Sequence, residues 1–178
     1  MSFADADAIP EYIQITQPQI FRQGNMTLNI EPGYLVRHDL VTLRLIKDAL
    51  PERPIYVSTG GGATLGLDPY LISQGFVQKL VDHPVANTPG IVQISGLNLD
   101  VPRTKALWDT VYHAPEALIK EGDWIDRASF GIPYTYAFTG AILKEAMLAT
   151  GDTKSADTIM NRVRAIVKAA RIEGFPGV

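Results

Sequence analysis

The stretch "PIYVSTGGGATLGLDPYLISQGFVQKLVD", residues 54–82, carries the pattern that decides the fold class. Aliphatic and aromatic residues in "PIYVST" (54–59) predict a buried strand. In "DPYLISQG" (68–75), an Asp at the cap, a Pro in the first turn and a closing Gly predict a short helix. "FVQKLVD" (76–82) predicts a second strand. The order strand, helix, strand predicts a small parallel βαβ-type unit within an α/β fold.

The segments before and after this unit carry their own signals. Prolines and glycines separate short alternating pieces over residues 1–33, which predicts an extended arm with short strands. Apolar residues at helical spacing predict a helix over 39–50, with Asp39 as N-cap and Pro51 as its stop. Residues 84–103 are rich in Pro and Gly and predict a loop that could include an edge strand.

The last third of the chain predicts a helical hairpin. "IPYTYAFTGAILKEAMLAT" (132–150) and "TKSADTIMNRVRAIVKAARIEG" (153–174) read as two helices, the second capped by Asp152 or Thr153 and closed by Gly174. The second helix has one apolar stripe, for which we consider two interpretations: it packs within this chain, or it fills a groove of a partner. The expected division is an arm (1–33), a small α/β domain (34–103) and a helical region ending in the hairpin (104–178).

Composition excludes several classes of protein. The chain has 178 residues, and its net charge of -3 argues against nucleic acid as a partner. The sequence has no Cys, which excludes thiol catalysis, disulfides and Cys-ligated zinc. No stretch of about 18 apolar residues exists, so we expect no direct bilayer insertion. The first residues do not have the pattern of a secretory signal peptide.

The glycine triplet Gly60, Gly61 and Gly62 raises the question of a phosphate site. Neither the dinucleotide fingerprint nor the Walker pattern fits the residues that follow. The expected helix start at Asp68 also lies too far along the chain for its N-terminus to share an anion with the glycines. We therefore favour a flexible or close-packed surface loop over nucleotide binding.

Other catalytic or metal-binding patterns are missing as well. The three histidines are far apart, and no serine lies in a Gly-x-Ser-x-Gly elbow. "EGDWID" (121–126) gathers three acidic residues around Trp124, which suggests either a cation or sugar site or a solvated acidic turn held by a packed Trp; we favour the turn. We therefore expect no catalytic residue, no cofactor and no metal ligand.

One region resembles a known family. In "LVRHDLVTLRLIKDALPERPIYVSTGGGATLGLDPYLISQGFVQKL" (35–80), the "RPIY" strand, "GLDPYL" and the Gly75–Phe76 turn resemble the soluble C-terminal region of a family of multi-pass, glycosyltransferase-like membrane proteins related to protein O-mannosyltransferases. This family was long catalogued as a domain of unknown function. The resemblance implies an α/β module on the extracytoplasmic, periplasmic face of a membrane. It also implies a tetratricopeptide-like hairpin at the C-terminal end.

The resemblance does not carry over any catalytic residue, because in such transferases catalysis belongs to the membrane-embedded part, which is absent from this sequence. The chain would be a fragment of such a protein or a free-standing relative. Our hypothesis is a non-catalytic extrinsic subunit that docks on a membrane protein complex, for example an electron-transfer or photosynthetic one. The alternative is a glycan- or acceptor-binding domain of a membrane glycosyltransferase. Candidate contact residues are Gly60, Gly61, Gly62, Trp124, Phe3, Ile9 and Tyr12.

Overall fold

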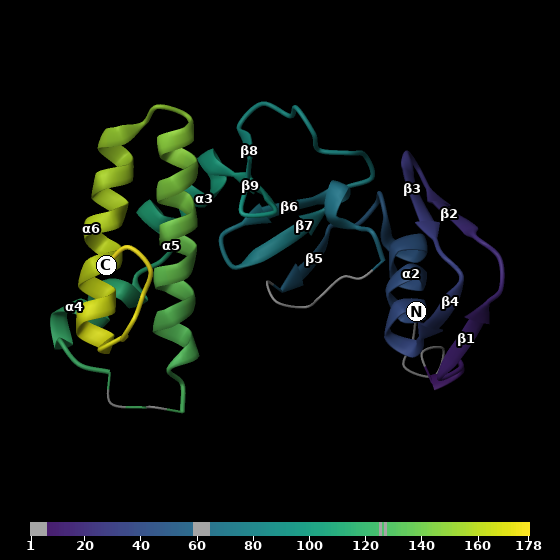
Figure 1. Ribbon diagram of the computed structural model, residues 1–178, viewed down its shortest axis with the longest axis horizontal. Coiled ribbons are helices and arrows are strands. Elements are labelled where there is room, and N and C mark those ends of the chain that lie inside the picture. Colours follow the sequence, from purple (N-terminus) through teal and green to yellow (C-terminus); the bar gives the residue numbers. More distant parts are fainter. Residues whose placement is uncertain (1–6, 59–64, 125, 127) are drawn as a thin grey trace. The chain divides into compact units, whose positions relative to one another are not determined.

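The computed structural model describes residues 7–58, 65–124, 126 and 128–178 (Figure 1). The protein is a mixed α/β structure, as expected. Its contacts divide the chain into two compact units. The N-terminal unit consists of Met1–Ile72 with Val77–Thr88, and the C-terminal unit consists of Ser73–Phe76 with Pro89–Val178.

Short antiparallel strand pairs form much of the N-terminal unit. β1 (Tyr12–Ile15) pairs with β4 (Gly33–Val36), and β2 (Gln19–Gln23) pairs with β3 (Met26–Ile30). The expected arm with short strands is therefore a set of paired strands. The inward residues of these strands and of helix α2 form a hydrophobic core. The buried residues of this core are Met26, Leu28, Leu35, Leu43, Ile46, Leu50, Leu65, Leu67, Tyr70, Leu71 and Leu80.

Helix α2 (Arg37–Ala49) begins two residues earlier than the sequence indicates. The prediction that Asp39 is the N-cap is wrong: Val36 occupies that position and Asp39 is the third helical residue. From there the Asp39 Oδ2 accepts a hydrogen bond from the Val36 N–H at 3.2 Å. An acidic residue at this position reaches back to the cap, so the same side chain stabilises the helix start from inside the first turn.

Residues 68–75, expected to form a short helix, form a single turn and a strand instead. One 3-10 turn, η1 (Asp68–Tyr70), leads directly into strand β6 (Leu71–Gln74). The helix prediction is wrong because the Asp-Pro pair starts only that turn, after which "LISQ" alternates between buried and half-buried positions as a strand does. Gly75, at φ +65°, turns the chain toward the next strand and does not close a helix.

The expected parallel βαβ unit is also not observed. β5 (Ile55–Ser58) pairs with β7 (Val77–Leu80) in antiparallel register, with Ile55 opposite Leu80. No crossover helix lies in the described part of the connection, residues 65–76, and antiparallel strands need none. The strands belong to a five-stranded mixed sheet of order β5-β7-β6-β9-β8, in which β6 and β9 form a parallel pair.

The region 84–103 has more regular structure than expected. β8 (Ile91–Ile94) lies last in the strand order, so the expected edge strand is present, and it pairs with β9 (Leu97–Asp100). The expected helical region follows, with α3 (Val101–Thr110) and α4 (Ala114–Glu121) ahead of the hairpin.

The predicted helical hairpin is confirmed. α5 (Gly131–Ala149) and α6 (Thr153–Ala170) lie side by side in Figure 1. Asp152 caps α6, and its Oδ1 accepts the Ser155 N–H at 3.1 Å. α6 ends before Arg171, which has a left-handed backbone at φ 54°, so the helix does not run to Gly174.

The apolar stripe of α6 packs within the C-terminal unit, which confirms the first of its two interpretations and excludes the partner groove. Its residues are all buried in one cluster: Ala156, Ile159, Met160, Val163, Ile166, Val167 and Ala170. Trp108 of α3 lies in the same cluster and is 0% exposed. Arg162 of α6 lies over its ring and donates a hydrogen bond to the Trp108 carbonyl oxygen at 2.7 Å.

Candidate interaction surface

Trp124 is half-buried. Its Nε1 is buried and has no hydrogen-bond partner among the described residues, and its ring packs against the core of the C-terminal unit. The acidic residues beside it make separate contacts: Asp123 binds Arg171 at 3.0 Å, and Asp126 accepts a hydrogen bond from the Ser129 hydroxyl. This hydrogen bond lowers the pKa of the Asp126 carboxyl. These contacts agree with the favoured acidic turn, which stays a prediction.

Each of the three histidines has a carboxylate of its own beside it. His38, His83 and His113 each face a carboxylate nearby in sequence, at 3.2 Å, 3.0 Å and 3.5 Å. Over residues 7–58, 65–124, 126 and 128–178, no three His, Asp or Glu side chains come together in a way that could hold a metal ion.

The remaining candidate contact residues differ in whether the structure describes them and in how exposed they are. Gly60, Gly61, Gly62 and Phe3 lie outside the described residues. Ile9 is half-buried, and Tyr12 is 60% exposed. Of the candidates that the structure describes, Tyr12 therefore offers the most accessible side chain.

Tyr12 belongs to an exposed aromatic face of the small β1–β4 sheet. In the register of the pair, Tyr12 lies opposite Val36 and Tyr34 lies opposite Gln14. Alternation along each strand sends these side chains to one face and Ile13, Ile15 and Leu35 to the other, where they pack on the core. The Tyr12 and Tyr34 rings meet edge to face, with centroids 5.8 Å apart and planes at 76°.

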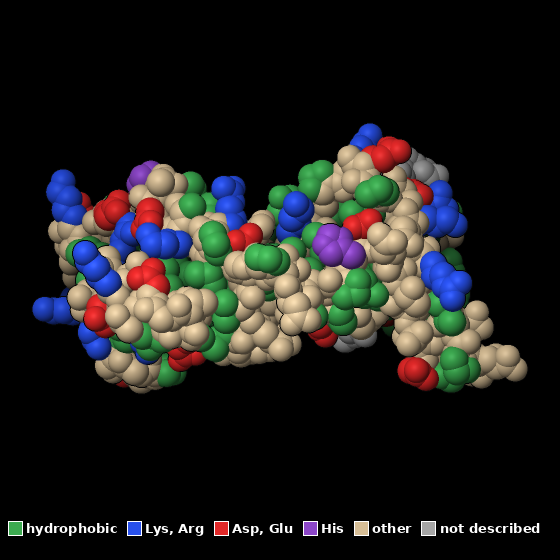
Figure 2. Space-filling view, turned by 90° about the horizontal axis from the view of Figure 1, so that it is seen from above, with side chains coloured by type: hydrophobic (Ala, Val, Ile, Leu, Met, Phe, Trp, Pro, Cys, Tyr) green, Lys and Arg blue, Asp and Glu red, His purple; other side chains and the backbone are tan. Residues whose placement is uncertain are grey.

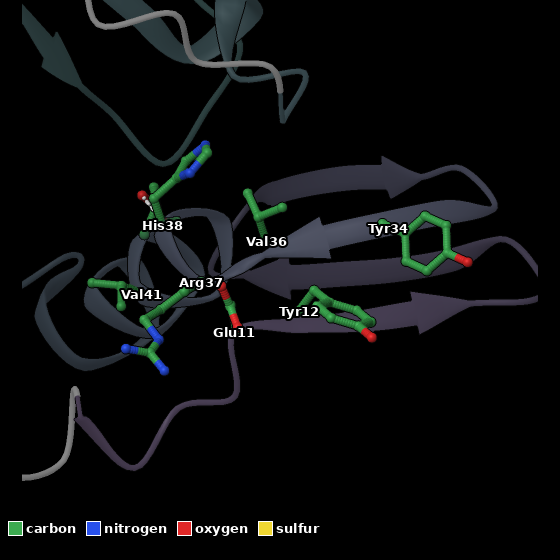
Figure 3. A pocket seen from close by; sticks show the side chains of 8 residues that line it. Glu11, Tyr12, Tyr34, Val36, Arg37, His38 and Val41 are labelled. Atoms are coloured by element: carbon green, nitrogen blue, oxygen red, sulfur yellow. Dashed lines mark hydrogen bonds between the residues drawn. The ribbon is translucent and has the colours of Figure 1, made fainter.

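The start of α2 completes a groove beside this face. Figure 3 shows Tyr12 and Tyr34 on neighbouring strands, with Glu11, Arg37 and Val41 close to where β4 leads into the helix. The open groove has a volume of about 990 Å³. The Arg37 N–H donates to the Glu11 carbonyl oxygen at 2.7 Å and ties the start of β1 to the start of the helix. We call this surface the Tyr12–Tyr34 face.

Tyr34 is not among the contact residues predicted from sequence, although the sequence holds a signal for it. "EYIQI" (11–15) and "GYLVR" (33–37) each place a Tyr directly before an aliphatic residue, which predicts opposite sides of a strand. What the pattern lacks is the pairing register, which brings the two rings together.

The chemistry of this face suits binding. Tyr12 and Tyr34 combine broad apolar rings with hydroxyl groups, and the guanidinium of Arg37, the imidazole of His38 and the carboxylate of Glu11 belong to residues that line the same groove. On the side of the molecule drawn in Figure 2, which labels no residues, Lys and Arg are interspersed with Asp and Glu. The surface therefore offers aromatic contact area with a mixed polar border.

Comparisons of the chain with protein-family models, curated proteins and solved structures found no match. The resemblance of residues 35–80 to the glycosyltransferase-like family therefore stays a prediction. In the described part of the chain, no helix combines the length and the apolar character needed to cross a bilayer.

Proposed function

We propose that this chain is a non-catalytic extrinsic subunit that docks through the Tyr12–Tyr34 face on a membrane protein complex. The observation that carries the proposal is the pair of adjoining Tyr side chains, 60% and 65% exposed, on the outer face of a two-stranded sheet. Tyr is enriched at the energetic centres of protein interfaces because a large rigid ring loses little conformational entropy on binding.

The surroundings of the two rings also resemble an interface. Val36 and Val41 extend the apolar area, and Glu11 and Arg37 border it with opposite charges. An apolar centre with a polar border is the usual anatomy of a docking surface. A partner with an apolar patch bordered by both charges would be complementary to it.

The membrane setting rests on the resemblance of residues 35–80, which suggests a position on the extracytoplasmic, periplasmic face. An electron-transfer or photosynthetic complex is the kind of host we propose. The same resemblance suggests a tetratricopeptide-like character for the α5–α6 hairpin. In this proposal the hairpin gives the subunit a stable body, and the Tyr12–Tyr34 face makes the contact.

The test is co-purification from native membranes. Tagged wild-type protein, added to membranes solubilised in mild detergent, should migrate with a large complex that mass spectrometry identifies. The double variant Tyr12→Ala/Tyr34→Ala should lose this association. Phe138→Ala, which removes an aromatic ring that is also half exposed but lies on α5, should retain it. Recovery of the wild type only as a free protein would overturn the proposal.

A second function is favoured by the same aromatic pair. Tyr rings can stack on sugar rings while Arg37, His38 and Glu11 bond the hydroxyl groups, as expected of a glycan- or acceptor-binding domain of a membrane glycosyltransferase. Binding to a glycan array that is lost in the Tyr12→Ala/Tyr34→Ala variant, with no co-purifying complex, would support this alternative.

A further inference from the structure

The polar side chains of the Tyr12–Tyr34 face are mainly hydrogen-bond donors. Within the described residues, the hydroxyls of Tyr12 and Tyr34 have no hydrogen-bond partner and the Arg37 guanidinium has no ion pair. A guanidinium carries five N–H donors and no acceptor, and each phenol adds one donor. Of the described residues that line the groove, Glu11 alone carries a carboxylate. The best complement is therefore a ligand with many acceptors and few donors.

The backbone of this face offers no partner for the N–H groups of a ligand. β1 and β4 pair with each other over Tyr12–Ile15 and Gly33–Val36, and the hydrogen bonds between paired strands lie in the plane of the sheet. A ligand that lies on the outer face therefore contacts side chains and does not extend the sheet. An ordinary peptide in this position would leave its own N–H groups without protein acceptors.

The apolar part of the groove suits a rigid, extended ligand. Val36 and Val41 extend the apolar area from the two rings toward α2 (Figure 3). The groove is open and has a volume of about 990 Å³, so it can contact a long ligand along one side. A flexible chain loses conformational entropy when it is ordered on such a surface. A ligand that is already extended before binding loses less.

We propose that the Tyr12–Tyr34 face binds a proline-rich segment of the partner protein in the polyproline II conformation. Proline has a backbone C=O and no N–H, so such a segment offers acceptors without donors. Proline-rich segments dock in grooves lined by aromatic side chains, and their extended helix forms before binding. Because the segment belongs to the partner complex, this binding mode rests on the proposed function.

Two other classes of ligand complement the same groups less well. A sugar hydroxyl donates as well as accepts, and the groove is poor in acceptors. A lipid acyl chain would cover the two rings but would bring no acceptor to the Arg37 guanidinium or to the Tyr hydroxyls. A proline-rich segment supplies both the apolar rings and the carbonyl oxygens.

The probe is a synthetic peptide of about ten prolines, which forms a polyproline II helix by itself. Titrated to about 1 mM into the ¹⁵N-labelled full chain, it should shift the amide signals of Tyr12, Tyr34 and Val36. A Gly-Ser peptide of the same length should shift none of them. Replacing alternate prolines by alanine restores N–H groups and flexibility, so it should weaken binding about tenfold.

Matched variants separate the rings from their hydroxyls. Tyr12→Phe/Tyr34→Phe keeps both rings and removes both donors, and it should weaken binding of the proline peptide about tenfold. Tyr12→Ala/Tyr34→Ala should abolish the shifts. Phe138→Ala removes a half-exposed ring of α5 and should leave binding unchanged.

Three results would overturn the inference. The first is the absence of shifts at Tyr12, Tyr34 and Val36 with the proline peptide. The second is binding that is unchanged in Tyr12→Ala/Tyr34→Ala. The third is an alanine-containing or Gly-Ser peptide that binds as well as the proline peptide.

The co-purification experiment distinguishes this inference from the proposed function. The proline peptide, added to the solubilised membranes, should release the tagged chain from its complex. A complex that depends on Tyr12 and Tyr34 but resists the peptide would support the docking function and overturn the proline-rich segment. Peptide binding at the Tyr12–Tyr34 face without any co-purifying complex would support the binding mode and overturn the membrane partner.

Discussion

The C-terminal unit packs a network of aromatic rings into its core, whereas the N-terminal unit leaves three tyrosines mostly exposed. In the C-terminal unit, Phe76, Trp108, Tyr112 and Tyr136 form a network of ring contacts, and Phe76 and Tyr112 stack at 4.5 Å. Burial raises the pKa of the Tyr112 and Tyr136 hydroxyls, as expected for phenols withdrawn from water. In the N-terminal unit, the side chains of Tyr12, Tyr34 and Tyr56 are mostly exposed. The ring network therefore stabilises the C-terminal core, whereas these three tyrosines face solvent and Tyr70 is the buried aromatic residue of the N-terminal core.

This contrast predicts that removing a ring has very different costs in the two units. Trp108→Ala should lower the free energy of unfolding by about 3–5 kcal/mol, because it empties the centre of a close-packed cluster. Urea unfolding followed by far-UV circular dichroism measures the change. Trp124, the remaining Trp of the variant, reports on the C-terminal unit by fluorescence.

The matched variants for that experiment are Tyr12→Ala and Tyr34→Ala. Each removes an exposed ring and should change the free energy of unfolding by no more than about 0.5 kcal/mol. A loss of several kcal/mol from either Tyr variant would show that the Tyr12–Tyr34 face has a structural role. A Trp108→Ala variant as stable as the wild type would show that the buried ring network does not stabilise the C-terminal unit.

The C-terminal hairpin could be predicted from sequence because its signals are local. The 3.6-residue repeat of α6, the Asp152 cap and the short "GD" connection all act within a few residues of one another. These signals agree in predicting two adjacent helices joined by a short turn, and the structure confirms this hairpin.

The N-terminal unit was harder because its outcome depends on distant partners. The Asp68–Pro69 pair is compatible with a helix or with a single turn, and pairing of the following residues in a sheet decides for the turn. The same limit applies to the candidate surface. Tyr12 was a candidate from sequence, but its neighbour Tyr34 follows from the register of β1 and β4, which no local pattern encodes.

Gly140 of helix α5 tests the packing of the C-terminal core with a smaller change, the addition of one methyl group. A Cβ at this position would lie 2.6 Å from Val163 Cγ2 and 2.9 Å from Trp108 Cζ2. Gly140→Ala should therefore destabilise the protein, since overpacking costs about 1–3 kcal/mol and outweighs the gain in helix propensity of about 1 kcal/mol.

The control for this variant is Gly131→Ala in the same helix, where a Cβ would meet nothing within 4 Å. It should unfold at the same urea concentration as the wild type or a slightly higher one. If Gly140→Ala instead raised the midpoint, the close approach of α5 to Trp108 and Val163 would be wrong.

The smallest expected effect concerns the charge at the start of α6. Hydrogen bonds from Ser155 to the Asp152 carboxylate lower the pKa of that carboxyl in the folded protein. A lowered pKa means that folding favours the ionised form. The contribution of this carboxylate to stability is therefore present above the ordinary Asp pKa of about 3.9 and is lost as the pH falls through the folded value.

Asp152→Asn keeps a capping side chain without the charge. It should therefore melt slightly below the wild type at pH 7, and this gap should close in acid. Asp152→Ala, which removes the cap itself, should remain less stable at both pH values. A gap between wild type and Asp152→Asn that is the same at pH 7 and in acid would show that the charge contributes nothing at this helix end.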